Sequence, residues 1–278
     1  MKRQGVRLDE HLVQEGLAET RARAQAAVLA GRVTVDGAVA DKPGRRVTPE
    51  MSVAVIGPAH PYVGRGGVKL AHALAAFGID VRGAAAIDLG ASTGGFTDCL
   101  LQAGAARVYA VDVGYGQLAW SLRQDPRVIV MEDTNARHLT SDRFAGAADL
   151  VTADLSFISL RLVWHAIAGL VRPGGHVVAL VKPQFEAGRA AVGRGGVVRD
   201  PEVHAAVLED ALASAARAGL APAGVTASPI TGPAGNIEYL VHLIRDGAAG
   251  APGAMKAPAL DVDAAVADAH RRLGRRGA

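Results

Sequence analysis

The sequence has few of the residues and segments on which several protein classes depend. Cys99 is the single cysteine among 278 residues, which excludes a disulfide framework and a thiolate zinc site. None of the nine histidines has metal-ligand spacing, so no metal is expected. No uncharged apolar run reaches the about 18 residues of a spanning helix, and the N-terminal stretch lacks the apolar segment of a signal peptide. We expect a cytoplasmic protein that does not span a membrane.

The composition is that of a folded chain with one medium and one small domain. Half of the residues are hydrophobic, which is ample for a buried core. The formal net charge of +3 hints only weakly at a polyanionic partner. Residues 1–60 hold 9 Lys and Arg against 7 Asp and Glu, whereas the other 218 residues hold 21 against 20. Basic residues are therefore slightly denser at the N-terminal end.

Residues 1–57 read as a small α+β domain. The stretch RLDEHLVQEG has apolar residues at helical spacing, which predicts a helix that ends at Gly16. A second helix is expected between Thr20, which would cap it, and Gly31. An alternating run with Asp36-Gly37 at its centre predicts a hairpin, and another strand is expected around residues 51–56. Residues 58–63 carry prolines and are expected to form a linker.

From residue 64 to about 245 the pattern alternates between apolar strands and helices. Strands are expected at AAAIDLG, RVYAVDVG, VIVMED, ADLVTADL and GHVVALVKP. This alternation predicts an α/β fold with a mostly parallel, doubly wound sheet. Ligands bind such sheets at the carboxyl ends of the strands. The Gly/Ala/Pro-rich tail, residues 246–278, is expected to be flexible, although residues 261–273 could form one short helix.

The stretch IDLGASTGGFTDCLLQAGA, residues 87–105, has the pattern of a cofactor-binding turn. A strand ends near Asp88, and glycines lead into a helix whose N-terminus suits an anionic group. A dinucleotide and S-adenosylmethionine are the competing cofactors, but the spacing of a dinucleotide fingerprint is not present. The glycines could instead serve packing alone. Asp112, at the end of the next strand, is placed to bind ribose hydroxyls, and Asp133 after the third strand is expected near the adenine.

Four more charged residues lie in distinctive segments: Lys69 in GRGGVKL, Asp154 in TADLSF, Lys182 in ALVKPQFE and Glu238 in GPAGNIEYL. Asp154 and Lys182 end predicted strands, so both should face the ligand crevice. Taken singly, each has an ordinary reading as a surface charge.

Together these segments resemble the TlyA (haemolysin A) family of ribosomal RNA 2′-O-methyltransferases, which have an S4 RNA-binding domain and an FtsJ/RrmJ-like catalytic domain. The resemblance covers about residues 5–245 and rests on RLDEHL, TRARAQAAVLAGRVTVDG, GRGGVKL, DLGASTGGFTD, TADLSFISL, KPQFE and GPAGNIE. Thr20 stands where Ser is common, and both residues cap helices. The resemblance implies a Rossmann-like class I methyltransferase domain over residues 64–245, S-adenosylmethionine as cofactor, and cytidine in 16S and possibly 23S rRNA as substrate.

The resemblance also implies roles for individual residues. Lys69, Asp154, Lys182 and Glu238 would form a catalytic tetrad, in which Lys182 takes the proton of the 2′-hydroxyl or stabilises the alkoxide. Which of these two roles Lys182 has stays open at this point, because Lys69 would lower its pKa while the two acids would raise it. The expected cofactor-binding residues are Asp88, Gly90, Ser92, Thr93, Gly94, Gly95, Phe96, Asp112 and Asp133. The expected RNA-binding residues are Arg7, Arg21, Arg23, Arg32, Lys42, Arg45, Arg46 and Arg65.

Three other functions are weaker alternatives. A base methyltransferase would use an Asn/Asp-Pro-Pro-Tyr-type loop or a catalytic cysteine, whereas this chain has ADLSF after its fourth strand. An RNA chaperone with an inactive enzyme domain is disfavoured by the intact tetrad. A membrane-lytic protein is not supported by any amphipathic or spanning segment. The Gly/Arg-rich stretch of residues 185–200 is interpreted either as a mobile flap near the substrate or as a plain surface loop.

Overall fold

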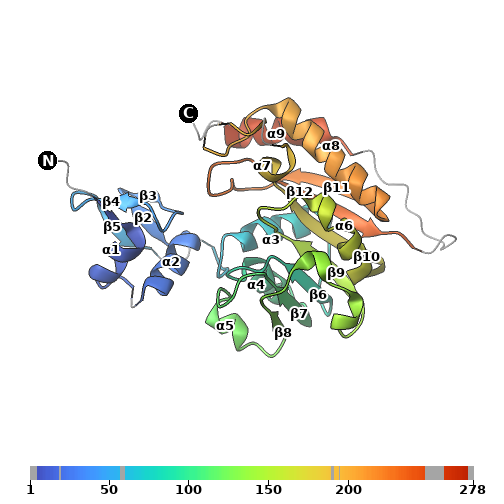
Figure 1. Cartoon of the computed structure of the whole chain (residues 1–278), viewed down its shortest axis with the longest axis horizontal. Coiled ribbons are helices and arrows are strands. Elements are labelled where there is room, and N and C mark those ends of the chain that lie inside the picture. Colours follow the sequence, from blue (N-terminus) through green and yellow to red (C-terminus); the bar gives the residue numbers. More distant parts are fainter. Residues whose placement is uncertain are drawn as a thin grey trace.

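The computed structural model describes residues 5–18, 20–56, 60–188, 191–193, 195–247 and 260–274. The small N-terminal domain contains two helices and short strands that form a two-stranded and a three-stranded sheet (Figure 1). Its elements are β1 (Val6–Arg7), α1 (Leu8–Gln14), α2 (Arg21–Leu29), β2 (Val33–Val35), β3 (Ala38–Val39), β4 (Arg46–Val47) and β5 (Val53–Val55). The two helices pack on the strands around a core that includes Leu8, Leu12, Val28 and Val33.

The local signals of this domain are confirmed. Thr20 accepts a hydrogen bond from the Arg23 amide and caps α2, and Gly16 adopts a positive φ of 68° after α1. Asp36 and Gly37 have φ values of 53° and 77°, as a type I′ hairpin turn requires. The antiparallel pair of β1 and β4 was not expected, because two-residue strands leave no alternating pattern in a sequence.

The large domain is built on a seven-stranded sheet in the order β11-β12-β10-β9-β6-β7-β8. The five strands from β6 to β10 are parallel, and β12 is antiparallel to both β10 and β11. The strands are β6 (Ala85–Leu89), β7 (Arg107–Val111), β8 (Val128–Met131), β9 (Ala148–Ala153), β10 (Val171–Val181), β11 (Leu220–Ala227) and β12 (Tyr239–Arg245). The predicted α/β class and the mostly parallel sheet are confirmed, and the chain order reverses between β6 and β9, where ligands bind in such sheets.

Helices cover both faces of the sheet (Figure 1). One apolar core joins the sheet to α3 (Gly66–Phe77) and α4 (Gly95–Gln102), and the short α5 (Trp120–Arg123) lies at its edge. The other core joins the sheet to α6 (Trp164–Leu170), α8 (Pro201–Arg217) and α9 (Val262–Leu273). Burial on both faces explains why the strands are almost continuously apolar.

The short helix that was considered for residues 261–273 is present, so the expectation of a flexible tail does not hold for this segment. Residues 262–273 form α9. Its N-terminus is capped by the Asp261 side chain, which accepts a hydrogen bond from the Ala264 amide. Val266, Ala269 and Leu273 are buried in the core that contains α8 and β11. Their spacing of three to four residues places them on one helix face, so this helix is part of the large domain. Residues 248–259 and 275–278 of the tail lie outside the described residues.

The segment between the domains is attached to the large domain. Residues 57–59 lie outside the described part of the chain. The Val63 amide donates a 2.8 Å hydrogen bond to the Asp98 carboxylate on α4. The Tyr62 ring lies where any side chain on Gly67 of α3 would have to stand, so a glycine is needed there. Among the described residues, no helix is long and apolar enough to cross a membrane.

Candidate active site

A glycine-lined turn joins β6 to α4 at the carboxyl edge of the sheet. Gly90 has a φ of 83°, and a Cβ there would lie 2.6 Å from the Asp154 carbonyl oxygen. Gly94 has a φ of 98°, and a Cβ there would overlap the Leu122 side chain. Both positions therefore require glycine. The turn leaves the N-terminus of α4 open toward the crevice, with backbone N–H groups suited to an anionic group. This cradle fits S-adenosylmethionine, whose carboxylate needs such donors.

Asp88 lies inside the fold instead of facing a ligand. Its side chain is fully buried in β6, and its carboxylate accepts hydrogen bonds from Thr97 at 2.7 Å and Thr152 at 2.9 Å. Burial raises the pKa of Asp88 to about 6, although the two threonine hydroxyls act in the opposite direction. Thr97 lies in the first turn of α4. Asp88 therefore holds the beginning of α4 to the sheet, which supports the cradle from behind.

The other expected cofactor residues divide into two groups. Gly90, Ser92, Thr93, Gly95 and Phe96 line one cavity. The Asp112 carboxylate follows β7 and accepts hydrogen bonds from the Ser92 amide at 2.8 Å and the Gly114 amide at 2.7 Å. Asp133 follows β8 and is exposed, with a φ of 51°. Asp112 and Asp133 therefore lie at successive strand ends beside the cradle, outside the cavity itself.

The four residues of the expected tetrad come together as two ion pairs. Lys69 of α3 donates to the Glu238 carboxylate at 2.6 Å. The Lys182 ammonium, at the end of β10, lies 2.6 Å from the Asp154 carboxylate at the end of β9. Lys69, Lys182 and Glu238 are each less than 10% exposed. All four line the same cavity as the glycine cradle, which has a volume of ≈ 240 Å³.

The two pairs stabilise each other's charges. Burial alone would lower the pKa of Lys69, but the nearby Asp154 and Glu238 carboxylates raise it above its usual value. Burial alone would raise the pKa of Asp154, but Lys182 and Lys69 hold it below its usual value. Both groups therefore stay charged at neutral pH.

Two further residues were not predicted, one in the lining of this cavity and one that supports the segments around it. The Ser156 hydroxyl accepts a 2.9 Å hydrogen bond from Lys182 and lines the cavity. Glu186, on α7 (Pro183–Glu186), is buried and accepts hydrogen bonds from the Ser159 hydroxyl at 2.6 Å and the Leu160 amide at 2.8 Å. It ties the loop after β9 to the helix after Lys182. The motif KPQFE contains Glu186, but nothing in the sequence indicates its partners.

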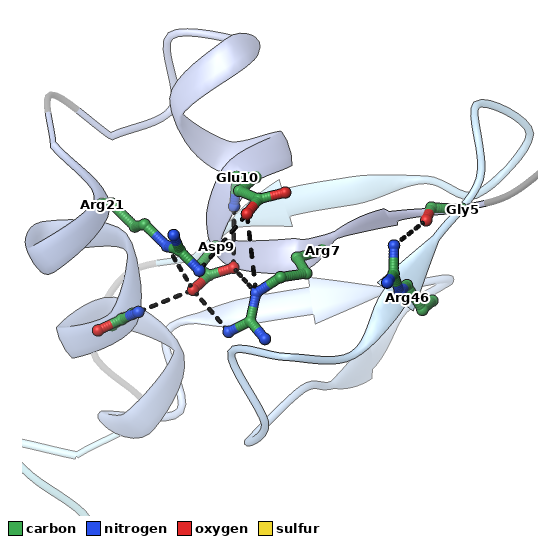
Figure 2. A network of polar contacts seen from close by, with 7 residues as sticks. Gly5, Arg7, Asp9, Glu10, Arg21 and Arg46 are labelled. Carbon is green, nitrogen blue, oxygen red and sulfur yellow. Dashed lines mark hydrogen bonds and ion pairs between the residues drawn. The ribbon is translucent and has the colours of Figure 1, made fainter.

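The basic residues of the small domain have unequal surroundings. Arg7 and Arg21 both bind Asp9, which is fully buried and also accepts a 2.8 Å hydrogen bond from Gln25 (Figure 2). Arg46 donates to the Gly5 carbonyl oxygen at 2.7 Å (Figure 2). These three arginines therefore also hold the domain together. The remaining predicted side chains of this domain, Arg23, Arg32, Lys42 and Arg45, are exposed.

Arg65 lies at the active site. It precedes α3 and lines the cavity with the tetrad. Its guanidinium lies 3.3 Å from the Asp41 carboxylate of the small domain and donates to the Thr231 carbonyl oxygen at 3.0 Å.

The second half of the Gly/Arg-rich stretch is anchored to the fold. Val197 and Val198 are buried. The Asn236 side chain accepts a hydrogen bond from the Val198 amide at 3.0 Å and donates one to the Gly196 carbonyl oxygen at 2.8 Å. Residues 189, 190 and 194 lie outside the described residues. The described residues 195–200 thus do not form a free flap; they are attached to the loop that carries Glu238.

Neither a cysteine nucleophile nor a metal site is supported by the described residues. Burial raises the pKa of the Cys99 thiol to about 12, so Cys99 is a poor nucleophile. Within the described ranges, no group of three or more His, Cys, Asp or Glu side chains could hold a metal ion.

Comparison with known proteins identifies both domains. Residues 62–245 match the FtsJ-like methyltransferase family, and residues 6–53 match the S4 domain. The chain belongs to the TlyA (haemolysin A) family. It is thus an S-adenosylmethionine-dependent methyltransferase with an S4 domain.

Relatives within the TlyA family match most of the chain. The chain is 50% identical, over 85% of its length and 89% of the relative's, to the 16S/23S rRNA (cytidine-2′-O)-methyltransferase TlyA of Mycobacterium tuberculosis strain H37Rv. It is 40% identical to Hemolysin A of Brachyspira hyodysenteriae, over 86% of this chain and all of that one. A solved structure from Streptococcus thermophilus has 43% identity and a TM-score of 0.76, with 98% of each chain covered.

Proposed function

We propose that this protein transfers a methyl group from S-adenosylmethionine to the ribose 2′-oxygen of a cytidine in ribosomal RNA. The observation that carries the proposal is the pair of buried ion pairs, Lys69–Glu238 and Lys182–Asp154, beside the glycine cradle of one cavity. Burying charges is unfavourable unless they are paired, and here the pairs line a cavity that a substrate can enter. The relative from M. tuberculosis supports the substrate class.

When bound, S-adenosylmethionine supplies an electrophilic methyl group. Gly90, Ser92 and Thr93 would hold it at the cradle, and Asp112 would accept hydrogen bonds from its ribose. The chain's task is to bring the 2′-oxygen into line with that methyl group and to handle its proton. Lys182 is placed for this task because Asp154 and Ser156 fix its ammonium in the lining of the cavity.

Lys182 can act in two ways. As a neutral amine it accepts the proton of the 2′-hydroxyl. As an ammonium it has a third N–H to donate, beyond those directed at Asp154 and Ser156, and can stabilise the developing alkoxide. Lys69 and Glu238 stay paired and orient the ribose. A rate that rises with pH supports the first role, and a rate that is flat with pH supports the second.

The small domain would hold structured RNA through its exposed basic side chains, which contact phosphates more than bases. We place the reaction in the cytoplasm, because the proposed substrate is ribosomal RNA. The target nucleotide and the choice between the two ribosomal subunits follow from mapping the product.

The test uses labelled S-adenosylmethionine with ribosomal subunits that lack the methyl group, followed by nucleoside mass spectrometry. We expect label in 2′-O-methylcytidine. Label on a base would retain the cofactor and overturn the role of the tetrad. Absence of label together with tight RNA binding would indicate a binding protein.

A further inference from the structure

Arg65 connects three parts of the molecule at the mouth of the active site. It stands four residues before Lys69, just ahead of α3. Its guanidinium contacts the Asp41 carboxylate, from the loop after β3, and the carbonyl oxygen of Thr231, from the loop before Glu238. One guanidinium therefore joins the small domain, α3 and a tetrad-bearing loop. We call this set of three residues the Arg65 clasp.

The Arg65 clasp lines the same cavity as the tetrad. The cavity that holds Lys69, Asp154, Lys182 and Glu238 is also lined by Leu29 and Asp41 of the small domain and by Arg65 and Thr231. RNA held by the small domain and entering this cavity would therefore lie against the clasp, which forms part of the cavity wall. A negatively charged strand would meet the Asp41 carboxylate there, which repels phosphates.

The chemistry of the clasp suits an exchange of anions. A guanidinium binds carboxylates and phosphates with the same planar set of donors. The Arg65 and Asp41 side chains are 24% and 30% exposed, so the pair is partly hydrated. Such pairs contribute little, about a two- to fivefold change in an equilibrium. A phosphate of a strand already held by the small domain can displace the Asp41 carboxylate.

The resemblance implies only that Arg65 binds RNA. We propose that it binds the phosphate beside the target ribose, and that Asp41 occupies that position in the absence of RNA. This inference rests on the proposed function. Asp41 is thus an internal competitor of the substrate, and Arg65 is a substrate-positioning residue. Entry of the RNA exchanges one ion pair for another and releases Asp41 of the small domain from Arg65.

The test compares variants of the full-length protein on ribosomal subunits that lack the methyl group. Arg65→Ala is expected to raise KM about tenfold, since it removes a charged hydrogen bond, and to lower the salt slope of RNA binding by about one. Because the residue positions substrate and does not handle the proton, kcat is expected to change far less than KM. Arg65→Lys keeps the charge without the planar donors and is expected to fall between Arg65→Ala and the wild type.

Asp41→Asn is expected to lower KM about two- to fivefold, since it removes the competitor. Its matched control is Glu15→Gln, which removes one negative charge from an exposed side chain of the same domain. In the Arg65→Ala background, Asp41→Asn should have no more effect than the control, which a double-mutant cycle measures.

Two results would overturn the inference. One is an effect of Asp41→Asn equal to that of Glu15→Gln in the wild-type background. The other is an Arg65→Ala protein with unchanged KM and salt slope. Both presuppose that the wild-type protein forms 2′-O-methylcytidine. If it does not, the proposed function fails, and the salt dependence of subunit binding by the same variants still decides whether Arg65 and Asp41 exchange.

Discussion

Each domain of this protein buries carboxylates, but it neutralises them differently. In the small domain the fully buried Asp9 is held by Arg7 and Arg21, whose side chains are 36% and 53% exposed. In the large domain Glu238 is held by Lys69, and both side chains are less than 10% exposed. The first arrangement leaves its cations at the surface, and the second buries them beside a cavity.

Asp88 adds a third case, because its partners are two neutral threonine hydroxyls. Hydrogen bonds from Arg7 hold the pKa of Asp9 well below its usual range, whereas burial raises the pKa of Asp88 to about 6. Burial alone therefore does not determine the charge of a carboxylate; the partner does. Asp9 and Asp88 stabilise the fold, and the buried lysines are the groups available for chemistry.

The largest expected effect is that of removing a buried lysine from the cavity. Lys182→Met should lower kcat by about a thousandfold, as expected for a group that handles a proton in the reaction, while affinity for S-adenosylmethionine and RNA changes little. Single-turnover methylation measures this. The matched control is Lys42→Met, the same substitution at an exposed lysine of the small domain. It should change KM and not kcat. Comparable kcat values for the two variants would contradict a catalytic role for Lys182.

The second prediction concerns the pH dependence of stability through Asp88. Its folded-state pKa of about 6 lies above the unfolded value of about 3.9. Its contribution to stability is therefore fully present below about pH 4 and is lost as the pH rises through 6. Relative to Asp88→Asn, the wild-type large domain should lose about 2 kcal/mol of unfolding free energy between pH 4 and 7. Urea unfolding of both proteins at several pH values measures this, and parallel curves would contradict it.

Asp9 should show the opposite pH dependence. Its folded-state pKa is lowered, so its contribution is present above the unfolded value of about 3.9 and is lost as the pH falls further. At pH 7, Asp9→Asn should destabilise the small domain by about 2 kcal/mol, because hydrogen bonds to charged groups are lost. Hydrogen exchange in α1 and α2 of the full-length protein measures this. Unchanged protection would show that Arg7 and Arg21 do not need Asp9.

The smallest expected effect separates RNA binding from stability within the small domain. Arg45→Ala should lower the salt slope of RNA binding by about one, without a change in hydrogen exchange, because its side chain is exposed. Arg21→Ala should change both, since Arg21 also binds Asp9. An Arg21→Ala protein with altered exchange and an unchanged salt slope would leave Arg21 with a structural role alone.

Much of the fold could be predicted because its signals are local. Thr20, Gly16 and the Asp36-Gly37 turn act on neighbouring backbone and need no tertiary contact. The apolar strands and the helices between them indicated a parallel sheet with both faces covered. The short helix considered for residues 261–273 is present as α9, but its packing on α8 and β11 was not predicted, because that packing depends on residues far along the chain.

The site was predictable in part for the same reason. The glycines between β6 and α4 could be recognised in the sequence, because a turn with positive φ values favours glycine. The functions of Ser156, Glu186 and Arg65 depend on partners far along the chain, such as Lys182 for Ser156 and Asp41 for Arg65. A serine or an arginine has no local signal of such a partner.

The sequence by itself determined the two domains, the parallel sheet and the cofactor turn, because these depend on periodicity and turn chemistry. The four charged residues of the tetrad came from the resemblance of their segments to the TlyA family. The tertiary structure alone decided which lysine pairs with which acid, that Asp88 supports the cradle from inside, and that Arg7 and Arg21 bind Asp9. The reason is physical: the charge state of a side chain is set by the partners and the burial that folding brings to it, and most of those partners lie far apart along the chain.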